Sequence, residues 1–143
     1  MKIFCIGLGR TGTTTFGTCM RMLGLNHCTG PVGLGLTLNS LSDYTALQKI
    51  IENYDSFSDF PWPLLYKKLS TWHPDAYFIL TRRKDVDTWY RSLCKHFDRT
   101  GPTEGKKLAY GYYFPRSAPT KIKEQYLIHL TNVRKHFNSN PRF

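Results

Sequence analysis

The chain has 143 residues, 41% hydrophobic and 15% aromatic, which is enough for one packed core and predicts a single domain over residues 1–143. No apolar run approaches the roughly 18 residues of a membrane span, no signal peptide precedes the first strand, and the histidines and cysteines lack metal-ligand spacing, so we expect a soluble cytoplasmic protein without a metal. The net charge of +10 favours anionic ligands, but without a zinc finger, RNA-recognition signature or basic zipper we expect no nucleic-acid partner.

The first 23 residues combine a strand, a loop and a helix. Residues 3–6 form an apolar run that predicts a buried strand, and a loop rich in glycine and threonine follows over residues 7–15. Apolar residues then recur at helical spacing, namely Phe16, Cys19, Met20 and Leu23. A glycine-rich turn that enters a helix places free backbone N–H groups and the positive end of the helix dipole around one point. The sequence therefore predicts an anion site in this loop.

The loop fits two known phosphate-binding patterns only in part. As a nucleotide triphosphatase loop, Gly7 and Gly12 have the required gap, but Thr13 stands where the lysine is needed. As a dinucleotide fingerprint, Gly7, Gly9 and Gly12 fit G-x-G-x-x-G, but no acidic residue occurs before Asp43 to hold the ribose. A nucleotide kinase or dinucleotide enzyme is therefore disfavoured and ranks third, behind the two functions considered below.

The middle of the chain alternates weak and strong patterns. Residues 25–29 predict a short, weak strand, and the glycine-rich residues 30–35 predict a loop. Ser42 can cap a helix over residues 42–53. Residues 58–61 break this pattern and begin another helix that runs to Trp72, because proline suits a first turn.

The second half of the chain begins with a strong strand at residues 76–81, apolar on both faces as in the centre of a parallel sheet. A helix over residues 85–97, an irregular aromatic loop over residues 105–119 and a last helix over residues 120–137 follow. Alternating strands and helices imply an α/β fold with a parallel sheet and right-handed crossovers. Residues 140–143 look like the turn into a further strand.

Two stretches resemble the sulfotransferases that use the donor 3′-phosphoadenosine 5′-phosphosulfate (PAPS). Residues 9–14 read Gly-Arg-Thr-Gly-Thr-Thr, which is similar to the phosphosulfate loop of that family, with Arg10 where lysine is frequent. The strand at residues 76–81 leads through Arg82-Arg83-Lys84-Asp85 into a helix carrying Ser92, which resembles the family's 3′-phosphate site. Residues 61–66 and 72–76 also look like single-domain members, and the resemblance extends from about residue 2 to residue 137.

The resemblance implies a fold and a function. The fold would be that of P-loop nucleotide triphosphatases, a parallel sheet flanked by helices, and one or more further strands would follow Phe143. The function would be transfer of a sulfuryl group from PAPS to a hydroxyl or amine of a small-molecule or carbohydrate acceptor. The alternative is an inactive anion-binding or interaction protein that kept the fold. An open sheet edge left by a missing strand would favour a homodimer.

The resemblance also implies roles for individual residues. The donor loop would comprise Gly9, Arg10, Thr11, Gly12, Thr13, Thr14 and Thr15, with Arg10 on the leaving phosphate. Arg83 and Ser92 would hold the 3′-phosphate, with Arg82 as the alternative to Arg83. An arginine not used there could pair with Asp85 or Asp87. Asp59 resembles the carboxylate that deprotonates the acceptor in some relatives, although it could instead cap the following helix.

Overall fold

The computed structural model describes residues 1–30 and 45–143. The glycine-rich segment beyond Gly30 and the helix start expected at Ser42 lie outside these residues. The elements in chain order are β1 (Ile3–Cys5), α1 (Thr13–Met22), β2 (His27–Thr29), α3 (Thr45–Asn53), β3 (Ser56–Ser58), α4 (Trp62–Trp72), β4 (Tyr77–Ile79), α5 (Val86–Thr100), α6 (Glu104–Tyr110), a 3-10 turn (Pro115–Ser117) and α7 (Pro119–His136). Within the described ranges, no helix is both long enough and apolar enough to cross a membrane.

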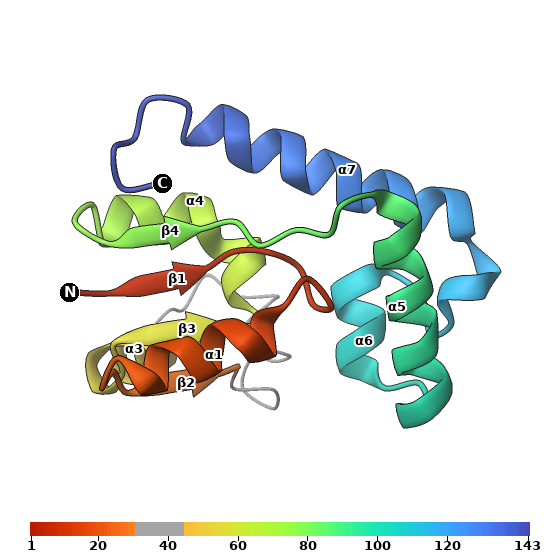
Figure 1. The fold of residues 1–143 in the computed structure, drawn as a ribbon, viewed down its shortest axis with the longest axis horizontal. Helices are drawn as coiled ribbons and strands as arrows, with labels where there is room; N and C mark the ends of the chain where they lie inside the picture. The colour runs from red at the N-terminus through yellow and green to blue at the C-terminus, as the bar shows by residue number, and fades with distance from the viewer. Residues whose placement is uncertain (31–44) are drawn as a thin grey trace.

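Four parallel strands form the sheet in the order β2-β3-β1-β4 (Figure 1). β1 lies between β3 and β4, with Phe4 opposite both Phe57 and Phe78. The three rings therefore line up across the sheet, with centroid distances from Phe4 of 4.7 Å to Phe57 and 5.6 Å to Phe78. This parallel sheet flanked by helices confirms the predicted α/β fold.

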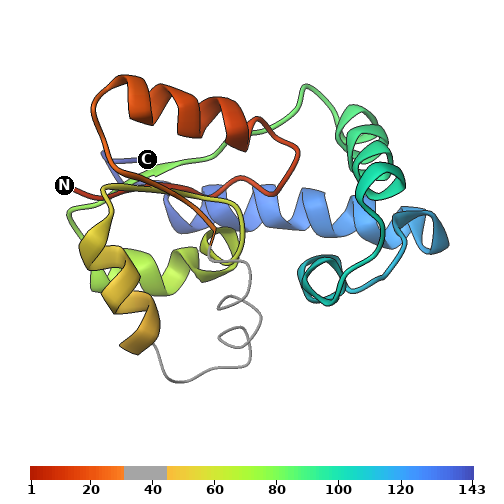
Figure 2. The same cartoon turned by 90° about the horizontal axis from the view of Figure 1, so that it is seen from below.

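Helices cover both faces of the sheet, as the view from below in Figure 2 shows. On one face lies α1, whose Phe16 and Met20 pack against β1. The other face is covered by α3, α4 and the C-terminal half of α7, which together with the row of phenylalanines form the main core. Cys19 and Leu23 were also expected on the apolar side of α1, but both are exposed, so the buried stripe of α1 is narrower than predicted.

The sequence pattern did not predict β3. Ser56 and Ser58 have no exposed surface, although serine is seldom fully buried. His27 of β2 satisfies both hydroxyls, with Nδ1 2.9 Å from Ser56 Oγ and Nε2 3.1 Å from Ser58 Oγ. The strand could not be predicted because its polar side chains form hydrogen bonds with His27, a residue from another part of the chain.

Residues 105–119 were predicted to be an irregular loop, and this is wrong for their first part. α6 occupies Glu104–Tyr110, and the Thr103 hydroxyl caps its N-terminus. A helix of 7 residues is too short for its apolar repeat to stand out in the sequence. The ring of Tyr110 is buried and meets Phe60 edge-on at a centroid distance of 5.6 Å.

A second apolar cluster lies beyond the carboxyl ends of the strands, where α5, α6 and the N-terminal half of α7 meet (Figure 1). Trp89 of α5 stacks on Tyr126 of α7, with a centroid distance of 4.2 Å and an interplanar angle of 13°. Leu8, from the loop after β1, is buried in this cluster. The loop is therefore held between the sheet and α5.

The C-terminal residues return to the outer edge of β4. A turn forms in which the N–H of Phe143 donates to the carbonyl of Asn140 at 3.2 Å. The N–H of Phe78 in β4 then donates to the carbonyl of Arg142 at 2.9 Å, and Phe143 stacks on Phe137 with centroids 5.0 Å apart. At least one hydrogen-bonding group on this edge is thus used within the chain, and the homodimer stays a prediction.

Unfolding should depend on pH, because burial lowers the pKa of four histidines below the ordinary value of 6.5: His27, His73, His96 and His129. The unfolded chain then binds protons before the folded protein does, so stability is present above pH 6.5 and is lost as pH falls below it. His129 lies next to the end of β1, where its Nε2–H donates to the carbonyl of Ile6 at 2.7 Å. We expect a lower urea midpoint at pH 5.5 than at pH 7.5, and a smaller difference in His129→Gln. Equal midpoints in the original chain would contradict this.

Candidate functional site

The loop between β1 and α1 presents free N–H groups. Gly12 stands at the N-cap position of α1 with φ 105°, and no side chain caps the helix. The first N–H groups of an α-helix have no partner within the helix, so those of α1 are open to an anion. Arg10, two residues earlier, has φ 72°, which is uncommon for a residue with a side chain.

Side chains from α5 and from the segment after β4 bond to the carbonyls and the Thr11 hydroxyl of this loop. The indole N–H of Trp89 donates to the carbonyl of Gly9 at 3.0 Å, and Arg83 Nε donates to the carbonyl of Arg10 at 2.7 Å. The buried Thr11 hydroxyl donates to the carbonyl of Leu8 at 2.6 Å and lies 2.7 Å from Thr81 Oγ1. With its carbonyls bound from behind, the loop keeps its N–H groups available on the other side.

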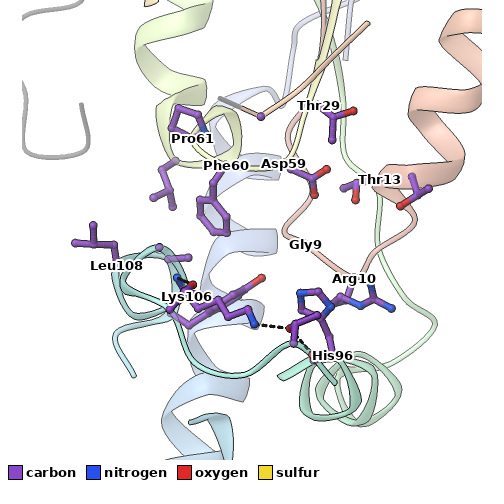
Figure 3. A pocket seen from close by; sticks show the side chains of 18 residues that line it. Gly9, Arg10, Thr13, Thr29, Asp59, Phe60, Pro61, His96, Lys106 and Leu108 are labelled. Carbon is purple, nitrogen blue, oxygen red and sulfur yellow. Dashed lines mark hydrogen bonds between the residues drawn. The ribbon is translucent and has the colours of Figure 1, made fainter. Parts of the chain in front are cut away.

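A cavity of about 490 Å³ opens in front of the loop (Figure 3). The loop and α1 contribute Gly9, Arg10, Thr13 and Thr14, and the ends of β2 and β3 contribute Thr29 and Asp59. The opposite side comes from α4, α5 and α6, through Leu64, His96, Lys106 and Leu108. Burial, followed by the nearby charges of Arg10 and Lys106, lowers the pKa of His96, which favours its neutral form. The exposed Thr15 does not line this cavity.

Asp59 projects into the cavity from the C-terminal end of β3. Its φ of 65° is again a left-handed conformation on a residue with a side chain, a kind of strain that often accompanies function. The Ser58 hydroxyl donates to Asp59 Oδ2 at 3.3 Å. α4 begins at Trp62 without a side-chain cap, so the alternative that Asp59 caps this helix is wrong. Ser58 uses its single hydroxyl proton in the bond to Asp59. Therefore Ser58 Oγ accepts from His27, and His27 Nε2 is the donor.

A smaller cavity of about 260 Å³ lies on the other side of Arg10 and is lined by Arg83, Thr88, Arg91, Ser92 and Lys95. Arg10 Nε donates to Ser92 Oγ at 3.4 Å, which links the two cavities. Arg82, the alternative to Arg83, is exposed and does not line this cavity.

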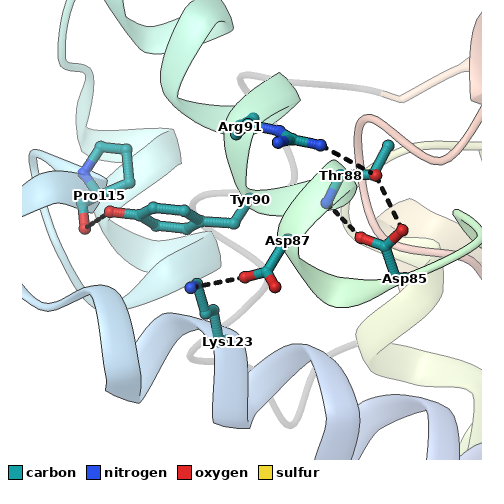
Figure 4. A network of polar contacts seen from close by, with 7 residues as sticks. All are labelled: Asp85, Asp87, Thr88, Tyr90, Arg91, Pro115 and Lys123. Carbon is teal, nitrogen blue, oxygen red and sulfur yellow. Dashed lines mark hydrogen bonds and ion pairs between the residues drawn. The ribbon is translucent and has the colours of Figure 1, made fainter.

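The two carboxylates near this smaller cavity are bound to other groups (Figure 4). Asp85 caps α5 by accepting from the N–H of Thr88 at 2.6 Å, and these bonds to Thr88 lower its pKa. Asp87 pairs with Lys123 at 2.7 Å, and a longer contact of 4.0 Å joins Asp85 to Lys84. The expected pairing of an arginine with Asp85 or Asp87 is thus not what the structure has. The guanidinium groups facing the cavity stay available to an anion.

Comparison with protein families identifies this arrangement, because a model described as a sulfotransferase domain matches residues 2–140. The chain belongs to the sulfotransferase domain family. The parallel sheet with its loop and helix is the P-loop fold of that family. No curated protein matches the chain. Across residues 1–30 and 45–143 of this sulfotransferase domain, no three side chains of His, Cys, Asp or Glu form a group that could hold a metal ion.

Several residues of the two cavities of this sulfotransferase domain were not predicted from the sequence. Thr88, Ser92 and Lys95 recur at steps of four and three along α5, and His96 follows Ser92 by four. Such spacing places neighbouring members close together on the helix, and Thr88, Ser92 and Lys95 line the smaller cavity while His96 lines the larger one. Starting from Ser92, this repeat could have found Lys95 and His96. Lys106 and Leu108 could not be found because α6 itself was not predicted.

Proposed function

We propose that this protein is a PAPS-dependent sulfotransferase that transfers a sulfuryl group to a hydroxyl. The observation that carries the proposal is Arg10, which lines the larger cavity while the Nε of its guanidinium donates to Ser92 Oγ in the smaller one. Two anion-binding regions joined by one cation suit a donor that carries a 5′-phosphosulfate and a 3′-phosphate on the same nucleotide. The membership of the sulfotransferase domain family supports the use of this donor.

The donor's phosphosulfate would lie at the N-terminus of α1. The N–H groups of the first turn, near Thr13 and Thr14, have no side-chain cap to compete with an anion. The buried Thr13 and exposed Thr14 both line the larger cavity and can add hydroxyl donors. Thr11 contributes only its backbone in this proposal, because its hydroxyl is already bonded to Leu8 and Thr81.

The 3′-phosphate would occupy the smaller cavity. Arg83, Arg91 and Lys95 supply positive charge there, and Ser92 supplies a hydroxyl. Arg83 also bonds to the carbonyl of Arg10, so its guanidinium is already fixed relative to the loop. A planar guanidinium that is held in this way suits the oxygens of a phosphate.

Sulfuryl transfer is an in-line displacement that depends on positioning and on electrostatic stabilisation. The acceptor oxygen forms a bond to sulfur while the bond from sulfur to the bridging oxygen breaks, and adenosine 3′,5′-bisphosphate leaves. Arg10 would stabilise the charge that develops on the leaving phosphate. Asp59, which projects into the same cavity, would take the proton of the acceptor hydroxyl.

The donor site is tested by titrating the chain with adenosine 3′,5′-bisphosphate, ATP and NAD in a calorimeter. We expect adenosine 3′,5′-bisphosphate to bind most tightly, because it alone offers a phosphate to each anion-binding region. NAD binding as strong or stronger would contradict the proposal. Failure of all three to bind would favour the alternative of an inactive interaction protein that kept the fold.

A variant pair makes the same titration specific for the 3′-phosphate. Lys95→Ala should weaken adenosine 3′,5′-bisphosphate about tenfold, since it removes a charged partner, and leave AMP unchanged because AMP lacks the 3′-phosphate. The matched control is Lys121→Ala, which removes an exposed lysine of α7 that lines neither cavity. Equal losses in both variants, or an equal loss for AMP, would mean that general charge attracts the ligand.

A further inference from the structure

We infer that the acceptor is an uncharged alcohol or phenol with an apolar body, and that it binds in the cavity of about 490 Å³ with its hydroxyl toward Asp59. This inference rests on the proposed transfer of a sulfuryl group. It concerns the walls of the cavity, whereas the donor-binding proposal concerns the loop and the smaller cavity.

Asp59 and the donor-loop residues lie on one side of the cavity and several apolar side chains on the other, where α6 also contributes Lys106 (Figure 3). Arg10 and Thr13 lie on the side of the donor loop, with Asp59 near them. Phe60, Pro61 and Leu108 are on the other side. A bound molecule would therefore meet the reacting groups with one end and apolar side chains with the rest of its surface.

The apolar wall is built from two separate elements. Phe60 and Pro61 come from the segment before α4, Leu64 from its first turn, and Leu108 from α6. Leu64 and Leu108 are 40% and 48% exposed, so both keep apolar surface that a ligand in the cavity could cover. A ligand with an apolar body would cover both side chains and remove their surface from water.

The two cationic side chains of the cavity, Lys106 and Arg10, are already bonded to other groups of the chain, which favours an uncharged acceptor over an acidic one. Lys106 Nζ is already bonded to Thr100 Oγ1 and to the carbonyl of Gly101, and it lies 4.7 Å from the ring centroid of Phe97. Arg10 Nε is directed to Ser92 Oγ. A sugar would need hydrogen-bond partners around its ring, whereas Phe60, Pro61, Leu64 and Leu108 offer carbon atoms.

The size of the cavity agrees with a small organic acceptor. Pockets for such ligands commonly measure about 300 to 1,000 Å³ and are lined mainly by apolar side chains with a few polar groups that fix the orientation. The volume of about 490 Å³ falls within that range. A bicyclic phenol is therefore a suitable probe.

The test compares 2-naphthol with methyl glucoside, each titrated into the full chain with and without adenosine 3′,5′-bisphosphate. We expect binding of 2-naphthol and none of methyl glucoside at the same concentration. Leu64→Asn and Leu108→Asn should each weaken 2-naphthol about tenfold without changing the affinity for adenosine 3′,5′-bisphosphate. Leu127→Asn is the matched control, because Leu127 is a leucine of α7, 47% exposed, that does not line the cavity.

The possible outcomes separate this inference from the donor proposal. Binding of adenosine 3′,5′-bisphosphate together with a preference for methyl glucoside, or with no 2-naphthol binding, would overturn the apolar acceptor alone. Binding of 2-naphthol that is lost in the two leucine variants, without any nucleotide binding, would support the apolar cavity and contradict the donor proposal. Equal losses in Leu127→Asn and the two variants would overturn the assignment to this cavity.

Discussion

Gly7→Ala is expected to destabilise the protein by about 3 kcal/mol or to prevent folding, because Thr81, in the segment after β4, leaves no room for a side chain there. A Cβ atom at Gly7 would lie 2.1 Å from Thr81 Oγ1, 2.3 Å from the Thr81 carbonyl oxygen and 2.8 Å from Thr11 Oγ1. The two threonine hydroxyls are hydrogen-bonded to each other, and that of Thr11 also donates to the carbonyl of Leu8. They cannot move without breaking these bonds. Urea unfolding followed by circular dichroism measures the loss.

Gly12→Ala is the matched control for this substitution. A Cβ atom there would meet nothing within 4 Å, but the φ of +105° is strained for alanine. This strain should cost about 1 to 2 kcal/mol without a steric clash. A loss in Gly7→Ala no greater than that in Gly12→Ala would show that Thr81 does not pack on Gly7 in this way.

Arg10→Ala is expected to lower the rate of sulfuryl transfer about 10²- to 10³-fold, the usual effect of removing one well-placed electrostatic donor. The reason is that Arg10 would contact charge that develops on the leaving phosphate as the bond to sulfur breaks. The affinity for adenosine 3′,5′-bisphosphate should fall by a smaller factor, since other groups also bind the nucleotide. Turnover of 2-naphthol at saturating PAPS, together with calorimetry, measures the two effects separately.

Two further variants define what the Arg10 result means. Arg10→Lys keeps the charge and should recover part of the rate, because lysine is frequent at this place in the sulfotransferases that the loop resembles. Arg134→Ala removes an exposed arginine of α7 that lines neither cavity and should leave turnover unchanged. Unchanged turnover in Arg10→Ala would remove this residue from the mechanism.

Much of the fold could be predicted because the central strands of the sheet are short apolar runs that are recognisable in the sequence. The apolar runs around Phe4 and Phe78 and the glycine loop between β1 and α1 are visible without any knowledge of contacts. β3 could not be predicted, because the buried hydroxyls of Ser56 and Ser58 find their hydrogen-bond partner in His27 of β2, which local sequence does not reveal. α6 is short and carries a glycine, so its local pattern is weak.

The candidate site likewise has residues that the sequence could predict and others that depend on contacts in the folded chain. The sequence pointed to Arg10 and Asp59, and these are the described residues other than glycine that have a positive φ. It could not choose between Arg82 and Arg83, because the choice depends on the bond from Arg83 to the carbonyl of Arg10. Which groups face one another across a cavity is a property of three-dimensional packing, so the apolar acceptor wall could not be foreseen.

The bonds from Trp89 and Arg83 to the loop carbonyls have a thermodynamic consequence. Ordering a flexible segment costs about 1 to 2 kcal/mol of conformational entropy for each residue. Since Trp89 belongs to a buried stack on α5 and α7, the loop loses this entropy when the chain folds and not when a nucleotide arrives. More of the interaction free energy of the bound anion then remains available for affinity. The aromatic stack, which lies away from the anion itself, thus determines in part how strongly the anion is held.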